Sequence, residues 1–220
     1  MQSRIIGSFA LFTTTKNPSQ FARYRKGLLF ILLALMLAVG VFVLQAVARH
    51  NFHVVSAGKI YRSAQLDADS LTQLVHEHGI KSVLNLRGSN AVSWYNVETN
   101  TSHQLGLEHF DFALSAGQEV KDAEMDQILA TIEKAPKPML IHCKSGADRT
   151  GLVGALYLYK FEGQTAESAD RELTLLCGHF PYLFWRDTVA MDHSFWRYVG
   201  NHPLTQHSVP TTTATERSNN

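Results

Sequence analysis

Hydrophobic residues along the chain form one long apolar run, followed by short apolar segments that alternate with amphipathic ones. The long run, Gly27 to Val47, carries no charged residue and is long enough to cross about 30 Å of hydrocarbon as a helix. Beyond residue 52, short apolar segments bounded by turn residues predict strands at 59–63, 80–86, 107–112 and 138–141. Apolar spacing and stop signals predict helices at 69–78, 91–104, 122–135 and 152–161, with two or three more between 166 and 198.

Strands that alternate with helices predict an α/β fold. We expect a mostly parallel central sheet flanked by helices, preceded by one transmembrane helix. The predicted parts are a short cytoplasmic segment at 1–26, a transmembrane helix at 27–48, a single α/β domain at 49–200 and a disordered tail at 201–220. The tail is rich in Thr, Ser and Asn and poor in apolar residues, a composition typical of disorder.

Positive charge is denser before the apolar run than after it. Such a bias places the N-terminus in the cytoplasm and residues beyond 48 across the membrane, which is the periplasm or cell exterior in a bacterium. The residues that carry the bias are Arg4, Lys16, Arg23, Arg25 and Lys26 before the run, and Arg49, Lys59 and Arg62 after it. A cleavable signal peptide is the alternative, because Ala46-Val47-Ala48 has the small residues of a cleavage site, and cleavage near Ala48 would give a secreted protein.

Composition excludes several classes of function. The 220 residues have a formal charge of +1 and contain no polybasic run, so we expect no nucleic-acid partner. Two cysteines, Cys143 and Cys177, do not make a disulfide framework. Cys177 is interpreted as a buried small apolar residue or as a resolving partner for oxidised Cys143. Nothing in the composition indicates an oligomeric state.

The segment from His142 to Gly151, HCKSGADRTG, carries the chemistry. It lies between an apolar strand and an apolar helix, where loop N–H groups and the helix dipole converge on an anion. Cys143 is a candidate nucleophile, and Arg149 has the planar fork that grips two phosphoryl oxygens. The loop N–H groups are predicted to bind the anion, Gly146 to allow close approach, His142 to lower the pKa of the thiol, and the Thr150 hydroxyl to lie near the sulfur. The remaining predicted substrate-binding residues are therefore His142, Lys144, Ser145, Gly146, Ala147 and Thr150.

This decapeptide resembles the signature of the cysteine-dependent protein tyrosine phosphatase superfamily, His-Cys, five residues, Arg-Ser/Thr-Gly. The likeness is greatest to its compact dual-specificity and lipid-phosphatase branch. Tyr61-Arg62-Ser63-Ala64-Gln65 and Leu84-Asn85-Leu86-Arg87 resemble early elements of compact bacterial members. The resemblance implies that 49–200 is a catalytic domain, with a phosphocysteine intermediate at Cys143, transition-state binding by Arg149 and no metal or other cofactor.

Two candidates remain open for the general acid. Asp111 lies 32 residues before Cys143, which matches the family's usual spacing, although its place on an apolar strand also suits a structural role. Asp148 lies inside the signature loop beside Arg149. A minority branch active on phosphoinositides carries Lys-Asp-Arg there, but this chain has Ala147 in place of the lysine.

These observations predict a membrane-anchored phosphatase for phosphate monoesters. The predicted partners are the membrane, through residues 27–48, and a phosphorylated protein, lipid or glycan. A catalytically silent phosphate-binding module of the same fold is the alternative, and a sulfurtransferase is a weaker one, since the Arg-Thr-Gly ending favours a phosphatase. The histidines are not spaced like metal ligands, so we predict no metal site.

Overall fold

The computed structural model describes residues 18–48, 50–89, 92–181 and 186–204. The chain divides into two compact units, Met1–Gln45 and Ala46–Asn220, which are described separately below. The predicted segment 1–26 and the predicted tail 201–220 lie largely outside the described residues.

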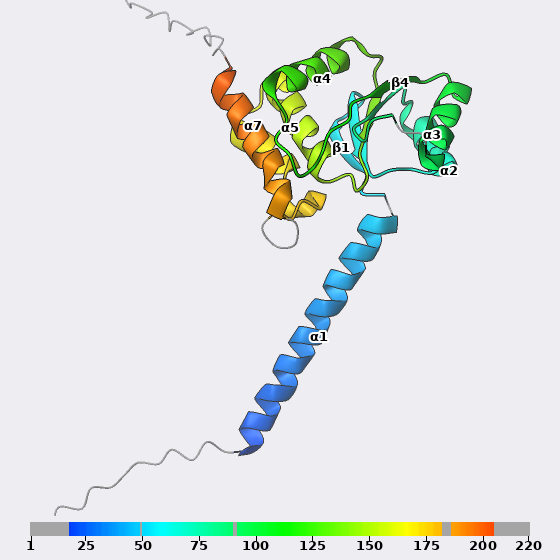
Figure 1. The fold of residues 1–220 in the computed structure, drawn as a ribbon. Helices are drawn as coiled ribbons and strands as arrows, with labels where there is room; N and C mark the ends of the chain where they lie inside the picture. Colours follow the sequence, from blue (N-terminus) through cyan, green and yellow to red (C-terminus); the bar gives the residue numbers. More distant parts are fainter. Residues whose placement is uncertain (1–17, 49, 90–91, 182–185, 205–220) are drawn as a thin grey trace, which may run out of the picture. The chain divides into compact units, whose positions relative to one another are not determined.

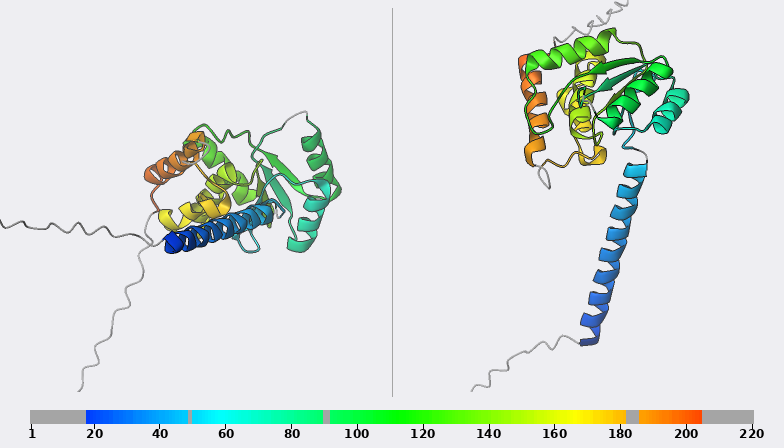
Figure 2. Two further views of the ribbon diagram at one scale, coloured as in Figure 1. Left: turned by 90° about the horizontal axis from the view of Figure 1, so that it is seen from below. Right: turned by 45° about the vertical axis from the view of Figure 1, so that its right-hand side comes forward.

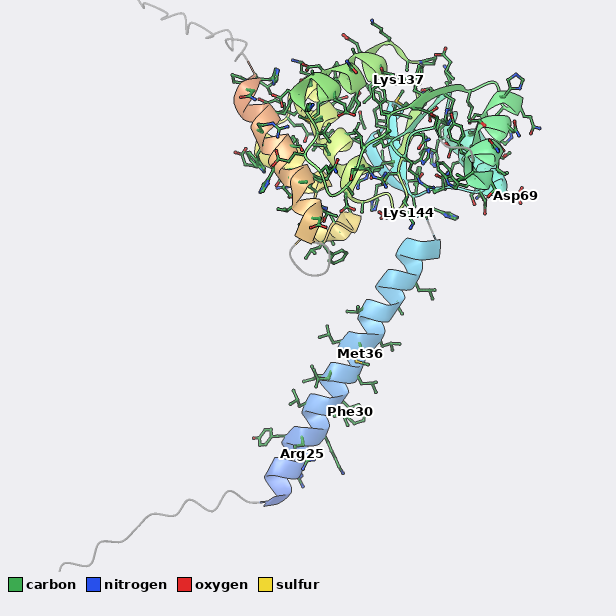
Figure 3. The ribbon with its side chains drawn as sticks, in the orientation of Figure 1. Arg25, Phe30, Met36, Asp69, Lys137 and Lys144 are labelled. Atoms are coloured by element: carbon green, nitrogen blue, oxygen red, sulfur yellow. The ribbon has the colours of Figure 1, made fainter. Side chains whose placement is uncertain are left out.

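The described residues of the first unit belong to helix α1 (Pro18–Ala48), which contains the predicted apolar run and whose last three residues fall in the second unit. Within it, Arg23–Val41 is long and apolar enough to cross a membrane. Phe30 and Met36 project outward from the helix (Figure 3), and they are 73% and 70% exposed. An apolar surface on all sides of a helix is typical of a membrane span or a signal sequence.

The second unit contains a five-stranded sheet with the strand order β1-β2-β5-β3-β4. Its strands are β1 (His53–Ser56), β2 (Ile60–Ser63), β3 (Ser82–Asn85), β4 (Glu108–Asp111) and β5 (Met139–His142). Strands β2, β5, β3 and β4 are mutually parallel, whereas β1 pairs antiparallel with β2. The sheet is therefore mixed rather than mostly parallel as predicted. The physical reason is the short turn between β1 and β2, because only antiparallel neighbours can be joined so closely.

Helices cover both faces of this sheet (Figures 1 and 2). Helices α2 (Ala68–His78) and α3 (Ser93–Gln104) lie on one side, and α4 (Asp122–Lys134), α5 (Asp148–Glu162) and α7 (Val189–Asn201) lie on the other. A short helix α6 (Ala166–Ala169) and three 3-10 turns at Asp170–Glu172, Leu175–Cys177 and Arg186–Thr188 connect α5 to α7. The predicted α/β class, with a central sheet flanked by helices, is confirmed.

Side chains that alternate along the strands fill two cores. Leu84 and Ile141 pack with α4, α5 and α7, whereas Val83 and Leu140 pack with α2 on the opposite face. This alternation follows the two-residue period of a strand. Strand β5 is buried throughout, so the loop that follows it rests on a rigid base at the carboxyl edge of the parallel strands, where open α/β sheets bind ligands.

Candidate active site

The signature loop connects the end of β5 at His142 to the start of α5 at Asp148. Cys143 lies at the base of the loop and is 1% exposed. Within the described part of the chain, the backbone N–H groups of residues 144–147 donate no hydrogen bond. Unpaired N–H groups at a helix N-terminus form an anion site. Lys144 and Ser145 are exposed on this loop, and Lys144 is labelled in Figure 3.

Gly146 allows the loop to approach its neighbours closely. Its φ is +67°, and a Cβ there would lie 2.5 Å from Ala64 N and from Ser63 C. Both the left-handed backbone and the lack of space require glycine at this position.

Arg149 extends from the first turn of α5 toward the sheet edge. Its Nη1 donates hydrogen bonds to Leu86 O at 3.2 Å and Leu114 O at 3.1 Å. Its buried Nε has no partner among the described residues. Because these bonds hold one side of the guanidinium, other N–H groups of the fork are left to receive oxygen acceptors.

Two other predicted binding residues have clear partners. The hydroxyl of Thr150 donates to Ala147 O at 3.3 Å rather than to the sulfur of Cys143, near which it was predicted. His142 Nε2 lies 3.0 Å from Glu98 Oε1. This histidine is therefore oriented from behind the loop by a carboxylate on α3.

Glu98 is the centre of a buried polar cluster under the loop. It also contacts His109 at 2.9 Å and accepts a hydrogen bond from Gln65. Burial opposes ionisation of Glu98, but the hydrogen bonds from His109, His142 and Gln65 lower its pKa to about 2. Glu98 is thus a carboxylate at all physiological pH values.

Arg62 supports the loop from its other side and is completely buried. Its Nη2 donates to Gly146 O at 2.8 Å and Ala147 O at 3.0 Å, and its Nη1 pairs with Glu172 Oε2 at 2.5 Å. The loop carbonyls are thereby turned toward Arg62, which leaves the N–H groups on the opposite side facing the anion position.

Asn51 adds a second support at the same carbonyls. Its Nδ2 lies 3.1 Å from Ser145 O, 2.9 Å from Gly146 O and 3.0 Å from Cys177 O. Its φ of +48° is in the left-handed region, which asparagine tolerates better than most residues.

Arg87 lies at the end of β3 beside Trp94. Its guanidinium carbon is 3.6 Å from the centroid of the Trp94 ring, and its Nη1 donates to Gln65 Oε1 at 2.9 Å. Burial and the neighbouring charge of Arg149 lower the pKa of Arg87. Two guanidinium groups thus lie near one another at the sheet edge, where their repulsion is relieved by an anion.

Asp111, the first acid candidate, is held by two donors. Asn85 Nδ2 donates to its Oδ1 at 2.8 Å, and the Tyr95 hydroxyl donates to its Oδ2 at 2.6 Å. This hydrogen bond to Asp111 raises the pKa of Tyr95 to about 12. Asp111, Asn85 and His142 are register partners across β4, β3 and β5, so Asp111 lies about two strand spacings, roughly 10 Å, from the start of the loop.

Asp148, the second acid candidate, is paired with a buried histidine. His179 is 1% exposed, and its Nδ1 lies 2.7 Å from Asp148 Oδ1 while its Nε2 lies 2.9 Å from Asp192 Oδ2. Burial alone would lower the pKa of His179, but the hydrogen bonds to Asp148 and Asp192 raise it to about 9. At neutral pH an imidazolium therefore links the first residue of α5 to α7.

Cys177 is half-buried, and burial raises the pKa of its thiol. Both Cys143 and Cys177 are free thiols. Among the described residues, no three His, Cys, Asp or Glu side chains are grouped so that they could hold a metal ion.

Comparison with known proteins shows the family of this chain. Residues 44–162, more than half of the chain, match the model of the tyrosine phosphatase family. The chain belongs to this family. The matched range includes the signature loop together with Arg62, Arg87 and Glu98. No curated protein matches the chain.

Solved structures of similar fold include phosphatases from bacteria and yeast. The catalytic core of the PP-IP phosphatase SIW14 from S. cerevisiae is 23% identical, with a TM-score of 0.51 over 69% of this chain and 91% of that one. A putative phosphatase from Shewanella putrefaciens is 12% identical, with a TM-score of 0.52 over 70% of this chain and 92% of that one. TpbA from P. aeruginosa is 24% identical, with a TM-score of 0.49 over 68% of this chain and 91% of that one. The fold is that of tyrosine-phosphatase-like enzymes.

Several supporting residues are not marked by the sequence. Arg62 resembles a family element without any local sign of its role, and it lies buried behind the loop. Asn51, Glu98 and His179 belong to none of the motifs that predict the site. No local sequence pattern marks any of these three residues, and the burial of Glu98 is seen only in the structure.

Proposed function

We propose that this protein hydrolyses phosphate monoesters through a covalent phosphocysteine at Cys143. The observation that carries this proposal is the combination of a buried thiol, unpaired loop N–H groups and an Arg149 guanidinium held beside them, within the part of the chain that the structure describes. Such a site binds a phosphoryl group and stabilises charge on its equatorial oxygens as the bond to the leaving group breaks.

The reaction has two steps. The thiolate of Cys143 attacks phosphorus, the bond to the leaving-group oxygen breaks, and that oxygen takes a proton from a carboxylic acid. A water molecule then attacks phosphorus and gives a proton back to the same carboxylate. The phosphorus–sulfur bond breaks, which releases inorganic phosphate and regenerates the thiolate.

Asp148 is our first choice for the proton donor, and Asp111 is the second. Asp148 lies on the loop itself, and one of its carboxylate oxygens makes no hydrogen bond among the described residues, whereas both oxygens of Asp111 accept hydrogen bonds. His179 then acts as a positioning residue that holds Asp148. The contribution of a general acid is typically about 100- to 10,000-fold in rate.

Helix α1 supports a membrane-bound location. We propose that residues 27–48 anchor the protein with its N-terminus in the cytoplasm and its catalytic domain outside, on the basis of apolar length and charge bias. Secretion after cleavage near Ala48 is the alternative. The molecular mass of the mature protein in membrane and soluble fractions distinguishes the two.

Phosphate release by the full chain, reconstituted in nanodiscs, tests the function. We expect release from p-nitrophenyl phosphate, loss of release in Cys143→Ser, and a phosphate adduct on the peptide that contains Cys143 after rapid acid quench. Turnover that survives in Cys143→Ser contradicts the covalent mechanism. A folded protein that binds phosphate analogues but releases none supports the silent binding module instead.

A further inference from the structure

Both ring nitrogens of the buried His179 face carboxylates. Its side chain is 1% exposed, its Nδ1 lies 2.7 Å from Asp148 Oδ1, and its Nε2 lies 2.9 Å from Asp192 Oδ2. Asp148 begins α5 and Asp192 belongs to α7, so the ring bridges two helices. The side chains of the two aspartates are 18% and 21% exposed, and the histidine is therefore the innermost member of this cluster.

The two contacts of the ring determine how many protons the cluster holds. A neutral imidazole has one N–H donor and one bare nitrogen, so it could donate to only one of the two carboxylates. The bare nitrogen would then face a carboxylate oxygen at hydrogen-bond distance with no proton between them, and these two acceptors would repel each other. Both contacts are satisfied only when the cluster carries one proton more than a neutral ring and two carboxylates.

This extra proton has two positions along the shorter contact. It lies on Nδ1 of His179, which gives an imidazolium beside a carboxylate, or on Asp148 Oδ1, which gives a neutral ring beside a carboxylic acid. Asp192 accepts the Nε2 proton in both forms, so it holds the ring in the tautomer that exchanges a proton with Asp148. One hydrogen bond thus connects Asp148 to a reserve proton.

The proposed general acid needs this proton at neutral pH. An aspartic acid alone loses its proton near about pH 4. The N-terminal end of a helix, where Asp148 lies, favours the charged carboxylate further. Without a nearby donor, Asp148 would be a carboxylate and could not protonate a leaving group.

We propose that His179 holds the proton that Asp148 passes to the leaving group, and that Asp192 positions the ring for this transfer. This inference rests on the proposed function and deepens it. His179 contacts no reacting atom of the substrate and acts through Asp148.

The proton returns to the ring in each cycle. In the first step the proton moves from Nδ1 of His179 to the carboxylate of Asp148 and from there to the leaving-group oxygen, while the phosphorus–sulfur bond forms and the phosphorus–oxygen bond breaks. In the second step the attacking water gives a proton to Asp148, which returns it to Nδ1. The ring ends the cycle as an imidazolium, and no further reactant is needed.

The reserve proton predicts a characteristic pH dependence. The hydrogen bonds to Asp148 and Asp192 raise the pKa of His179 to about 9, so the cluster keeps its extra proton well above neutral pH. The charged groups near the ring are Asp148 on α5, Asp192 on α7 and Asp170 on the 3-10 turn between these helices. Proton transfer to a poor leaving group should therefore persist to about pH 9.

The ratio of two rates, measured against pH, tests this proposal. The full chain in nanodiscs is supplied with phenyl phosphate, whose leaving group needs a proton, or with p-nitrophenyl phosphate, whose leaving group does not. The ratio of the two kcat values cancels effects on Cys143 and on folding, because these act on both substrates. We expect the ratio to fall by about 100-fold across a midpoint near about pH 9.

Three variants separate a proton reserve from a purely structural contact. His179→Gln can still donate a hydrogen bond to Asp148 but cannot carry the extra proton. Its ratio should be lower by about 100-fold at neutral pH, and its midpoint should move by more than about two pH units toward acid. Asp192→Asn keeps an acceptor for Nε2 but loses a charge, so its midpoint should move by about one pH unit in the same direction. His193→Gln, an exposed histidine on α7, is the matched control and should follow the wild type.

Failure of the inference and failure of the proposed function give different results. A wild-type midpoint below about pH 6, or a ratio that falls in His179→Gln without a shift of the midpoint, would mean that His179 only holds Asp148 in place. A ratio unchanged in Asp148→Asn would also overturn the inference, and in each of these cases the phosphatase remains. No hydrolysis of either substrate counts against the proposed function.

NMR of the ring protons decides the inference without turnover. In full-chain Cys143→Ser with isotope-labelled histidine, His179 should show two ring N–H signals at neutral pH, assigned by their loss when His179→Gln is added. One of the two signals should be lost near about pH 9. A single ring N–H signal at neutral pH would overturn the inference, whether or not the protein hydrolyses a substrate.

Discussion

Arg62 Nη2 donates a hydrogen bond of 2.8 Å to Gly146 O, and both the arginine and the glycine are buried. A cation buried behind the signature loop thus fixes the direction of its carbonyl groups. The face of the loop that carries the unpaired N–H groups depends on this contact, although Arg62 itself lies on the opposite side.

Replacement of Arg62 should therefore affect both stability and activity. Arg62→Gln leaves Glu172 without its buried partner, and such a loss costs about 3 kcal/mol in the free energy of unfolding. Urea denaturation measures this change. Arg171→Gln, an exposed arginine in the same region, is the control and should change the free energy by less than about 0.5 kcal/mol. Equal effects of the two variants would contradict the role of Arg62.

Gly146→Ala should inactivate the protein by deforming the loop. The new Cβ would meet the backbone of residues 63 and 64 at 2.5 Å in addition to the strain of a positive φ. Gly163→Ala separates the two effects, because Gly163 has a φ of +64° with no atom within 4 Å of the added Cβ. The control should lose about 1–2 kcal/mol of stability and retain phosphate release. Normal activity in Gly146→Ala would show that the loop has another conformation.

His179 should make stability depend on alkaline pH. Its pKa is about 9 in the folded protein and about 6.5 in an unfolded chain. The folded-state pKa is raised, so the stabilisation is fully present below about pH 6.5 and is lost as the pH rises through about 9. Protonated His179 should contribute on the order of 2–3 kcal/mol to the free energy of unfolding.

Urea denaturation of wild type and His179→Gln between about pH 6 and pH 10 checks this expectation. The charged groups that face His179 are Asp148, Asp192 and the nearby Asp170. The free energy of unfolding of the wild type should exceed that of the variant at about pH 6, and this difference should disappear toward about pH 10. His193→Gln, an exposed histidine, should follow the wild-type curve. Parallel curves for wild type and His179→Gln would mean that the imidazolium contributes nothing.

The two acid candidates differ in how they should respond to the leaving group. Asp148→Asn should lower kcat by about 100-fold for an aryl phosphate with a poor leaving group and by much less for p-nitrophenyl phosphate, whose leaving group needs no proton. Asp111→Asn should reduce both rates by a similar factor, because it disturbs Asn85 and Tyr95. The reverse pattern would assign the acid to Asp111.

Local patterns account for most of the fold and for the centre of the site. The helix predicted at 122–135 is found at Asp122–Lys134, and the strand predicted at 59–63 is found at Ile60–Ser63. Strand β1 has no clear sequence pattern because its four residues are only partly buried or exposed. Its antiparallel pairing with β2 makes the sheet mixed. The strand predicted at 107–112 ends at Asp111, with a single bridge beyond it between Arg87 and Ala113.

The roles of the supporting residues could not be predicted from the sequence, because the residues that they contact are distant along the chain. Arg62 contacts the loop across 84 residues, Asn51 across 95 and Glu98 across 44. A sequence period reports on one helix or strand, whereas these contacts depend on how strands are ordered in the sheet. Cys143 and Arg149 could be chosen as candidates from the sequence because both belong to one short segment, HCKSGADRTG.

Asn51 affects how a soluble fragment of this protein should be made. A fragment that begins at the first strand, His53, keeps every strand of the sheet, yet it lacks a side chain that contacts the signature loop at two carbonyl oxygens. Low activity in such a fragment would reflect a damaged loop and would be mistaken for a requirement for the membrane. A fragment that begins at residue 49 retains this side chain, and it is the appropriate reference for any comparison between anchored and released enzyme.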